Sequence, residues 1–451
     1  MAEVTLYFPK GFKWGCATSP YQTEGENTNS DWWAWEQGEG HIAGGQKSGK
    51  SCDWWGDGFL TDLEWMARLN NNAQRLGVEW SRIEPKEGAF DDAALERYRF
   101  MLKSLRERGI EPLVTLHHFS NPIWIAERGG WETPEILPLF ERYVTKVVER
   151  LKDLCDFWIT INEPMIHAAL GYLQAAGDGV RHQTTFPPGK NDLKLMLNVV
   201  ENMLLGHAGA YHTLHRLQPE ARVGIAHNMA YLEPANPRSP FDRFFTGVHE
   251  RLVNRGMAEA VLYGRIPRLV GSRRVRALRN SVDFIGLDYY TRELVKFDRQ
   301  AADSGFSRRL QNRAGEMSDG NYGEVYPRGL YHLLRRLGRY GKPLYITENG
   351  IPDHDDDRRP AFLINHLKQV WHAINENVPV LGYYHWTLTD NFEWAEGWNL
   401  RFGLIELDPE TCTRTLRKSG ELYAEICQAN LLNTDMVSRY APELMETVFK
   451  G

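Results

Sequence analysis

The feature that most constrains the fold is a repeated pattern in which a short apolar run ends abruptly in polar residues and an amphipathic stretch follows. The runs cover Phe12 to Ala17, Ala73 to Val78, Pro112 to Leu116, Phe157 to Ile161, Val223 to Ala226, Phe284 to Leu287, Leu344 to Thr347 and Val380 to Tyr384. Each run is mostly apolar and does not alternate strictly with polar residues. Such runs are typical of parallel strands that are buried on both faces.

The stretches between the runs have the periodicity of helices. Apolar side chains recur at helical spacing in 95–105, 140–151, 196–217, 330–337 and 362–374, which predicts one buried face for each helix. Eight strands alternating with helices favour a closed (β/α)8 TIM barrel over an open doubly wound sheet, whose first strand would be followed by a GxGxxG turn that is absent here. No glycine- or serine-rich linker interrupts the chain, so we expect residues 1–451 to form a single α/β domain.

The chain is long for such a barrel. A bare barrel needs roughly 250 residues, and the surplus lies in long segments that follow the strands. These segments cover about 18–60, 119–135, 163–195, 228–248, 291–325 and 387–415. Because segments that follow the strands build the C-terminal face of a barrel, we expect a deep pocket there.

Polar or aromatic residues able to face this pocket stand where the runs end: Gln22, Arg75, His117, His118, Asn162, Glu163, Asn228, Tyr290, Glu348, Trp386 and, beyond it, Glu393. Glu163 and Glu348 each close a strongly apolar run, a costly position for a carboxylate that is neither partnered nor used. The fourth and seventh strands of a barrel are not neighbours, so these carboxylates would bracket a substrate from opposite sides. Glycoside hydrolysis needs this arrangement: one acid protonates the leaving oxygen, and the other carboxylate attacks or activates water.

Composition excludes several other classes of function. The net charge is −6, so the chain has no basic surface for nucleic acid, and no apolar stretch approaches the roughly 18 residues of a membrane span. The N-terminus lacks the pattern of a signal peptide and the five cysteines are widely spaced, which indicates reduced thiols and a cytoplasmic location. The 15 tryptophans exceed ordinary usage, and aromatic faces are suited to sugar rings.

The local sequences also resemble a known family. TINEP around Glu163 and ITENG around Glu348 are similar to the acid/base and nucleophile motifs of glycoside hydrolase family 1, the β-glucosidase family. The resemblance spans the chain through FKWGCATSPYQTEG, WSRIEP, TLHHF, DFIGLDYYT, YHWTLTDNFEWAEGWNLRFGL and RTLRKSGELY. It implies a retaining β-glucosidase-like hydrolase that removes terminal non-reducing β-D-glucosyl, and also β-galactosyl or β-fucosyl, residues through a covalent glycosyl-enzyme.

The resemblance implies that Glu348 is the nucleophile and Glu163 the general acid/base, and that Arg75 and Tyr290 keep Glu348 ionised. It also implies a set of sugar-binding residues: Asn162 at the 2-hydroxyl, Trp386 beneath the ring, Asn228 as a further contact, and, at the other hydroxyls, Gln22, His118, Glu393 and Trp394. On physical grounds we expect Arg75 to lower the pKa of Glu348. We expect burial to raise the pKa of Glu163 toward about 6–7.

The sequence departs from the family pattern at three places. Met165 follows the Asn-Glu-Pro motif beside the expected leaving-group site, Phe119 replaces a more common Trp, and Asp288 replaces the usual Asn before the tyrosine pair. The expected partners are small β-glycosides and oligosaccharides, with no metal, cofactor, nucleic acid or membrane. The alternatives are a 6-phospho-β-glycosidase, which Glu393 would oppose by charge repulsion, a non-catalytic sugar-binding barrel, and a metal-dependent barrel hydrolase.

Overall fold

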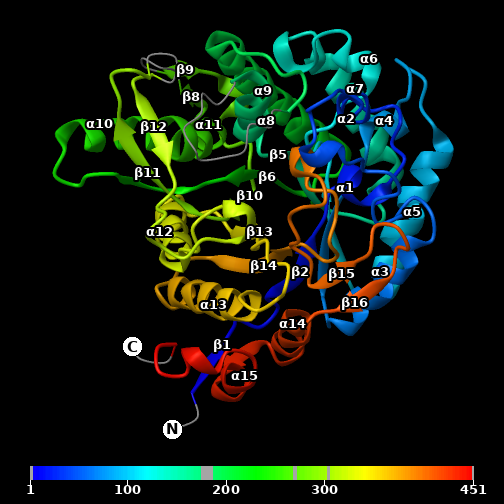
Figure 1. The fold of residues 1–451 in the computed structure, drawn as a ribbon. Helices are drawn as coiled ribbons and strands as arrows, with labels where there is room; N and C mark the ends of the chain where they lie inside the picture. The colour runs from blue at the N-terminus through cyan, green and yellow to red at the C-terminus, as the bar shows by residue number, and fades with distance from the viewer. Residues whose placement is uncertain (1–3, 174–185, 268–271, 302–304, 449–451) are drawn as a thin grey trace.

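The predicted barrel is confirmed. A computed structural model describes residues 4–173, 186–267, 272–301 and 305–448, and in this part of the chain eight parallel strands form a closed barrel (Figure 1). In chain order they are β2 (Lys13–Ala17), β3 (Ala73–Gly77), β4 (Glu111–Thr115), β5 (Phe157–Asn162), β6 (Arg222–Asn228), β10 (Phe284–Tyr289), β13 (Leu344–Asn349) and β14 (Val380–Trp386). Pairing of β10 with both β6 and β13 closes the ring.

Five strands continue past their apolar runs. β5, β6, β10, β13 and β14 include polar or aromatic residues that the sequence pattern places after the strand. Three of these residues are Asn162, Asn228 and Glu348. Since their backbones remain paired in the sheet, their side chains are held by regular structure and not by loops.

An outer layer of helices covers the barrel, with one helix of this layer after each barrel strand among the described residues. These helices are α3 (Gly58–Arg68), α5 (Asp92–Glu107), α7 (Ile136–Leu151), α9 (Leu193–Leu217), α11 (Gly256–Tyr263), α12 (Pro327–Gly338), α13 (Arg359–Asn375) and α14 (Lys418–Ala429). The predicted faces are buried: Leu95, Tyr98, Leu102 and Leu105 of α5 lie in the core between the helices and the barrel. The Asp91 carboxylate caps α5 by accepting hydrogen bonds from the amides of its first turn.

The barrel interior is filled by side chains at the end opposite the pocket. Phe157, Phe284 and Tyr345 contact one another edge to face, with ring centroids 4.9–5.2 Å apart. The Arg222 guanidinium lies 4.2 Å from the centre of the Phe157 ring. These contacts fill the floor of the barrel, as expected of a packed barrel core whose ligand site lies at the C-terminal mouth.

The long segments after the strands contain structure of their own. They hold α1 (Pro20–Glu24), α2 (Asp31–Glu36), α4 (Trp80–Ile83), α6 (Ile123–Ala126), α8 (Pro164–Tyr172), β7 (Tyr231–Pro234), α10 (Pro240–His249), β11 (Arg292–Phe297), β12 (Ser307–Leu310), the 3₁₀ turn η7 (Trp394–Glu396), β15 (Ile405–Leu407) and β16 (Arg414–Leu416). A thick rim needs such elements because its buried backbone groups must be hydrogen-bonded. Residues 174–185 and 302–304, which belong to two of the predicted segments, lie outside the described residues.

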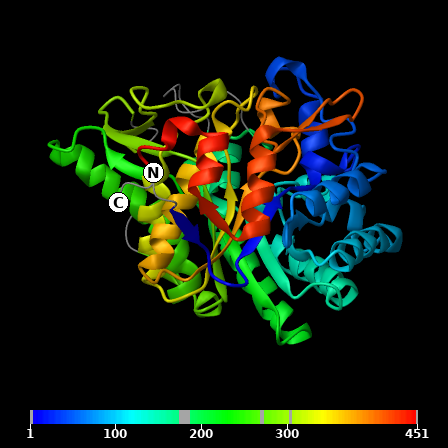
Figure 2. The same cartoon turned by 90° about the horizontal axis from the view of Figure 1, so that it is seen from below.

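The two ends of the chain pair on one side of the molecule. β1 (Thr5–Tyr7) is antiparallel to β17 (Leu431–Asn433), and the sequence pattern gave no sign of this pair. Figures 1 and 2 both show β1, in dark blue, beside the red C-terminal helices. Within the described residues, no helix combines the length and apolar character needed to cross a membrane.

Candidate active site

A pocket of about 760 Å³, measured with its open mouth, lies at the carboxyl ends of the barrel strands. Eight residues expected from the sequence line it: His118, Glu163, Asn228, Tyr290, Glu348, Trp386, Glu393 and Trp394. Gln22, Arg75 and Asn162 are fully buried and lie behind this lining, to which they are hydrogen-bonded. The structure therefore brings these predicted site residues together, whereas His117 does not line the pocket and instead contacts Asn121 and Trp131.

Glu348 is held by two donors that the sequence analysis named. Its Oε1 accepts a hydrogen bond of 2.7 Å from Nη1 of Arg75, and its Oε2 accepts one of 2.6 Å from the Tyr290 hydroxyl. Arg75 is itself fixed by Thr115 and by the backbone carbonyl of Thr347. These contacts fix both oxygens of the carboxylate in the pocket wall.

The expectation that Glu348 would have a lowered pKa beside Arg75 is wrong. Burial is the largest influence and raises this pKa, and the nearby carboxylate of Asp288 raises it further. Arg75 and Tyr290 act in the opposite direction but do not outweigh these two effects. A like charge so close favours the neutral form of its neighbour, especially where little water screens it.

Glu163 stands at the junction of β5 and α8. Its backbone is left-handed, with φ 44° and ψ 58°, a conformation that costs a residue with a Cβ on the order of 1–3 kcal/mol. Its amide donates to the carbonyl of Ala226 at 2.9 Å, and Asn228 Nδ2 donates to its Oε1 at 2.8 Å. The strained turn directs the carboxylate away from the helix and into the pocket.

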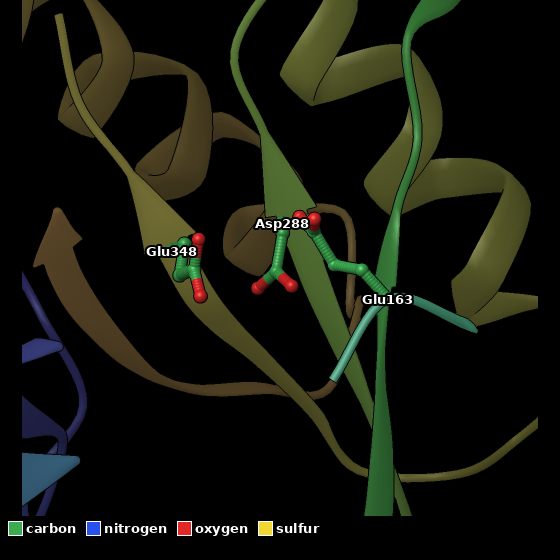
Figure 3. A group of neighbouring side chains, drawn as sticks. All are labelled: Glu163, Asp288 and Glu348. Carbon is green, nitrogen blue, oxygen red and sulfur yellow. The ribbon is translucent and has the colours of Figure 1, made fainter. Parts of the chain in front are cut away.

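The two glutamates face each other across a short gap (Figure 3). One carboxylate oxygen from each of Glu163, Asp288 and Glu348 lies within 4.8 Å of the others. Inverting glycosidases separate their two carboxyl groups by about 6.5–9.5 Å to admit a water, whereas retaining enzymes hold them about 5–5.5 Å apart. The gap fits direct attack by one carboxylate.

Glu393 lies deeper in the rim, where Gln22 orients it. Nε2 of Gln22 donates to Oε2 of Glu393 at 3.0 Å and to Asn391 at 3.1 Å. The Ser19 hydroxyl in turn donates to Oε1 of Gln22 at 2.7 Å, which fixes the amide. Glu393 thus presents an oriented carboxylate to the pocket, suited to accepting hydrogen bonds from hydroxyl groups.

His118 lies between two tryptophans. Its ring is close to parallel with the rings of Trp386 and Trp394, at centroid distances of 6.1 and 5.9 Å. Burial and the charge of Arg75 hold the pKa of His118 well below its usual range, so the imidazole is neutral. Nδ2 of Asn162 donates to its Nε2 at 3.1 Å, which leaves Nδ1 as the protonated nitrogen. That Nδ1–H is buried and has no hydrogen-bond partner among the described residues.

Part of the pocket lining was not predicted from the sequence. Ile166, Leu170, Phe186, Asn321, Tyr322, Ala395 and Glu396 also contact the pocket. They belong to the rim segments, where no strand end indicates a pocket residue. The apolar character of α8 was the signal that the sequence offered.

Met165, expected beside the leaving-group site, instead packs against the core between the helices and the barrel. The next residue, Ile166, lines the pocket in its place.

The three clustered carboxylates could in principle attract a cation. Arg75 already supplies a positive charge to two of them, at 2.7 Å from Glu348 and 3.6 Å from Asp288. A metal ion at this place would have to share their oxygens with the guanidinium, which opposes binding through like charge. That the site uses no metal or cofactor stays a prediction.

A (β/α)8 barrel that holds two closely opposed glutamates at its C-terminal mouth has the arrangement of a retaining glycoside hydrolase. The sequence model of glycosyl hydrolase family 1 matches residues 4–432. The chain belongs to this family, whose members are retaining β-glycosidases.

Individual relatives are similar over nearly their full length. β-Glucosidase A of Thermotoga maritima is 32% identical, with 94% of this chain and 98% of that protein covered. A β-galactosidase of Sulfolobus acidocaldarius is also 32% identical, with 94% and 96% covered. The solved structure of a β-glycosidase from Pyrococcus horikoshii matches with a TM-score of 0.89 and 37% identity, covering 98% of this chain and 100% of that one.

Proposed function

We propose that the whole chain acts as one catalytic domain that hydrolyses terminal non-reducing β-D-glucosides, and also β-galactosides and β-fucosides. Glu348 is the nucleophile and Glu163 the general acid/base. The observation that carries the proposal is the short gap between these two carboxylates, since one oxygen of Glu163 and one of Glu348 lie within 4.8 Å of each other. Relatives named β-glucosidase and β-galactosidase support both sugars as substrates.

In the first step, ionised Glu348 attacks the anomeric carbon while Glu163 gives its proton to the glycosidic oxygen. The bond to the leaving alcohol breaks, and a covalent glycosyl-enzyme with the α configuration forms. Arg75 and Tyr290 stabilise the carboxylate before attack, and its negative charge disappears as the bond forms. Asn228 orients Glu163 through its 2.8 Å hydrogen bond.

In the second step, Glu163 takes a proton from water, which attacks the anomeric carbon from the side that the alcohol has left. The bond to Glu348 breaks, and the sugar leaves with its original β configuration. Proton NMR on freshly mixed enzyme and substrate tests this directly. The β anomer should appear first, and early release of the α anomer would contradict the division of roles.

Substrate choice depends on Glu393. An oriented carboxylate can accept two charge-assisted hydrogen bonds from adjacent hydroxyls, each contributing about 1.5–3 kcal/mol when water is excluded. Either orientation of O4 can reach one of its oxygens, which accommodates glucosides and galactosides. A 6-phosphate would place like charges together in a buried pocket, so the 6-phospho-β-glycosidase alternative is disfavoured.

A kcat/KM series over aryl glycosides tests the proposed function. We expect turnover of aryl β-glucoside, β-galactoside and β-fucoside, little turnover of the 6-phospho-β-glucoside, and no loss of rate with a chelator. Equal efficiency on the phosphorylated substrate would favour the rival function. Loss of rate with the chelator would favour metal-dependent hydrolysis, and tight binding without turnover would indicate a sugar-binding barrel.

Replacing Glu393 by glutamine should lower kcat/KM for aryl β-glucosides by about 10- to 100-fold, because one or two charge-assisted hydrogen bonds become neutral. Discrimination against the 6-phosphate should weaken, since the repelling charge is gone. The matched comparison is Glu396→Gln, which removes the same charge from the rim of the same pocket. If both variants change the phosphate discrimination equally, a general charge effect is responsible and the special role of Glu393 is wrong.

A further inference from the structure

Asp288 is a third carboxylate in the site, positioned by an irregularity in the sheet. The pairing of β10 with β13 shifts register after Leu287, so that Asp288 becomes the partner of Glu348. Bulges of this kind redirect side chains near active sites. The Thr347 hydroxyl, at the bulge, donates to Oδ1 of Asp288 at 2.6 Å. Asp288 and Glu348 therefore point toward the same space, as Figure 3 shows.

The second oxygen of Asp288 faces Glu163. Oδ2 is buried, and no amide, hydroxyl or guanidinium group of the described residues donates a hydrogen bond to it. Glu163 lies close enough to be the donor when it carries a proton. A buried carboxylate oxygen without a fixed donor is costly, so the two carboxyl groups favour sharing one proton. Burial raises the pKa of Asp288, whereas Arg75 and the hydrogen bonds from Thr347 and Glu163 lower it and favour placing the shared proton on Glu163.

One guanidinium serves two of these carboxylates. Nη1 of Arg75 is 2.7 Å from an oxygen of Glu348 and 3.6 Å from an oxygen of Asp288. The side chains of Arg75 and Asp288 are both fully buried. A single positive charge cannot compensate two carboxylates as fully as one, so each retains part of its repulsion for the other. The charge of Asp288 thus favours retention of a proton on either neighbouring glutamate.

We propose that Asp288 is a positioning residue that controls the protons of the site: its charge keeps a proton on Glu163 and delays the ionisation of Glu348 to higher pH. The inference rests on the proposed roles of the two glutamates. It assigns Asp288 no contact with the reacting atoms, and it predicts that one substitution moves the whole pH profile.

Other groups facing Asp288 keep one charge over the relevant range. From β3, Arg75 stays positive, and from β10 itself, burial and Glu348 raise the pKa of Tyr290 well above its usual range, so its hydroxyl keeps its proton. His118, just after β4, is buried and neutral because burial holds its pKa well below its usual range. His227 on β6 pairs with Leu287, the neighbour of Asp288, and is neutral because burial lowers its pKa to about 3. Beyond β14, Glu393 adds negative charge near Glu348. The groups left to change charge around Asp288 are therefore the two glutamates and Glu393.

The direction of the effect follows from like-charge repulsion. Activity rises with pH as Glu348 loses its proton and falls as Glu163 loses its own. If the charge of Asp288 is removed, both glutamates release their protons at lower pH. Both limbs of the kcat/KM profile should then move to lower pH, by about one unit for a like charge at this distance.

The test compares kcat/KM for an aryl β-glucoside from pH 4 to pH 10, roughly the range between the usual pKa values of carboxylates and tyrosine, in the natural enzyme and Asp288→Asn. Asparagine keeps the shape and can still accept the Thr347 hydrogen bond. Asp283→Asn is the matched control: Asp283 lies just before β10 at the opposite end and contacts Tyr211, His215 and the amide of Val223. Circular dichroism and thermal denaturation establish that each variant is folded, and Asp288→Ser replaces the asparagine variant if that one unfolds.

We expect both limbs to move to lower pH in the Asp288 variant and neither to move in the Asp283 control. A folded Asp288 variant with unmoved limbs, a change in one limb alone, or a lower rate at every pH without a shift would overturn the inference. The natural enzyme gives an independent check, because an acidic midpoint at the ordinary glutamate value of about 4.3 would also overturn it. Failure of the proposed function looks different: the natural enzyme would hydrolyse no aryl β-glycoside at any pH.

Discussion

Replacing Glu348 by alanine is expected to lower kcat for aryl β-glucosides by a factor on the order of 10⁴ or more, with KM changed far less. Removal of a nucleophile eliminates the covalent route, and the remaining binding groups supply a small residual rate. The pocket keeps Gln22, His118 and Glu393, so sugar binding should persist. Steady-state kinetics with a chromogenic substrate, together with calorimetry of a competitive inhibitor, measures the two effects separately.

Azide or formate should restore turnover to the Glu348→Ala enzyme. The truncated side chain leaves a cavity beside Nη1 of Arg75 and the hydroxyl of Tyr290, and these two donors can bind a small anion in place of the carboxylate. The anion attacks once, from the side opposite the leaving group, so the product should be the α-glycosyl azide. The natural enzyme with azide is the control. Absence of rescue, or a β-azide product, would mean that Glu348 is not the group that attacks.

Most of the barrel could be predicted from the sequence because strand burial leaves a strong local signal. Runs such as Phe157 to Ile161 are apolar on both faces, and the helices between them carry one apolar stripe. The pairing of β1 with β17 left no such signal, since each strand has three residues and the two are far apart in the chain. The structured rim was also missed, because its short helices and strands form only when packed on the barrel.

The catalytic pair could be predicted for the same reason: each glutamate closes an apolar strand. The pKa of Glu348 could not, because its direction depends on how burial, Arg75 and Asp288 add together in space. Nothing in the sequence shows that β13 bulges at Thr347 and brings Asp288 opposite Glu348. Local sequence thus placed the groups that react, while their electrostatic balance depends on strand register.

Replacing Glu163 by alanine should give a different defect from that of Glu348, one that depends on the leaving group. A general acid contributes about 10²- to 10⁴-fold where the leaving oxygen needs a proton. Alkyl β-glucosides should lose that factor in kcat/KM. A dinitrophenyl β-glucoside, whose leaving group departs without a proton, should react almost normally in the first step and then stall, because no base activates water. Rapid mixing should show a burst of phenolate followed by a slow steady state.

Azide should release this stalled intermediate with the opposite stereochemistry from the Glu348 variant. The anion attacks a glycosyl group already bound to Glu348, from the face that Glu163 occupied, so two inversions give a β-glycosyl azide. Position 163 has a left-handed backbone with φ 44°, and alanine, which also carries a Cβ, has the same strain there as glutamate. Backbone strain therefore does not account for a difference in activity between the Glu163→Ala variant and the natural enzyme. Glu163→Gln, which keeps the side-chain volume, should show the same dependence on leaving group but less rescue, because the amide fills the space that azide needs. If the two glutamate variants respond alike to leaving group and yield the same azide anomer, the assignment of acid/base and nucleophile is wrong.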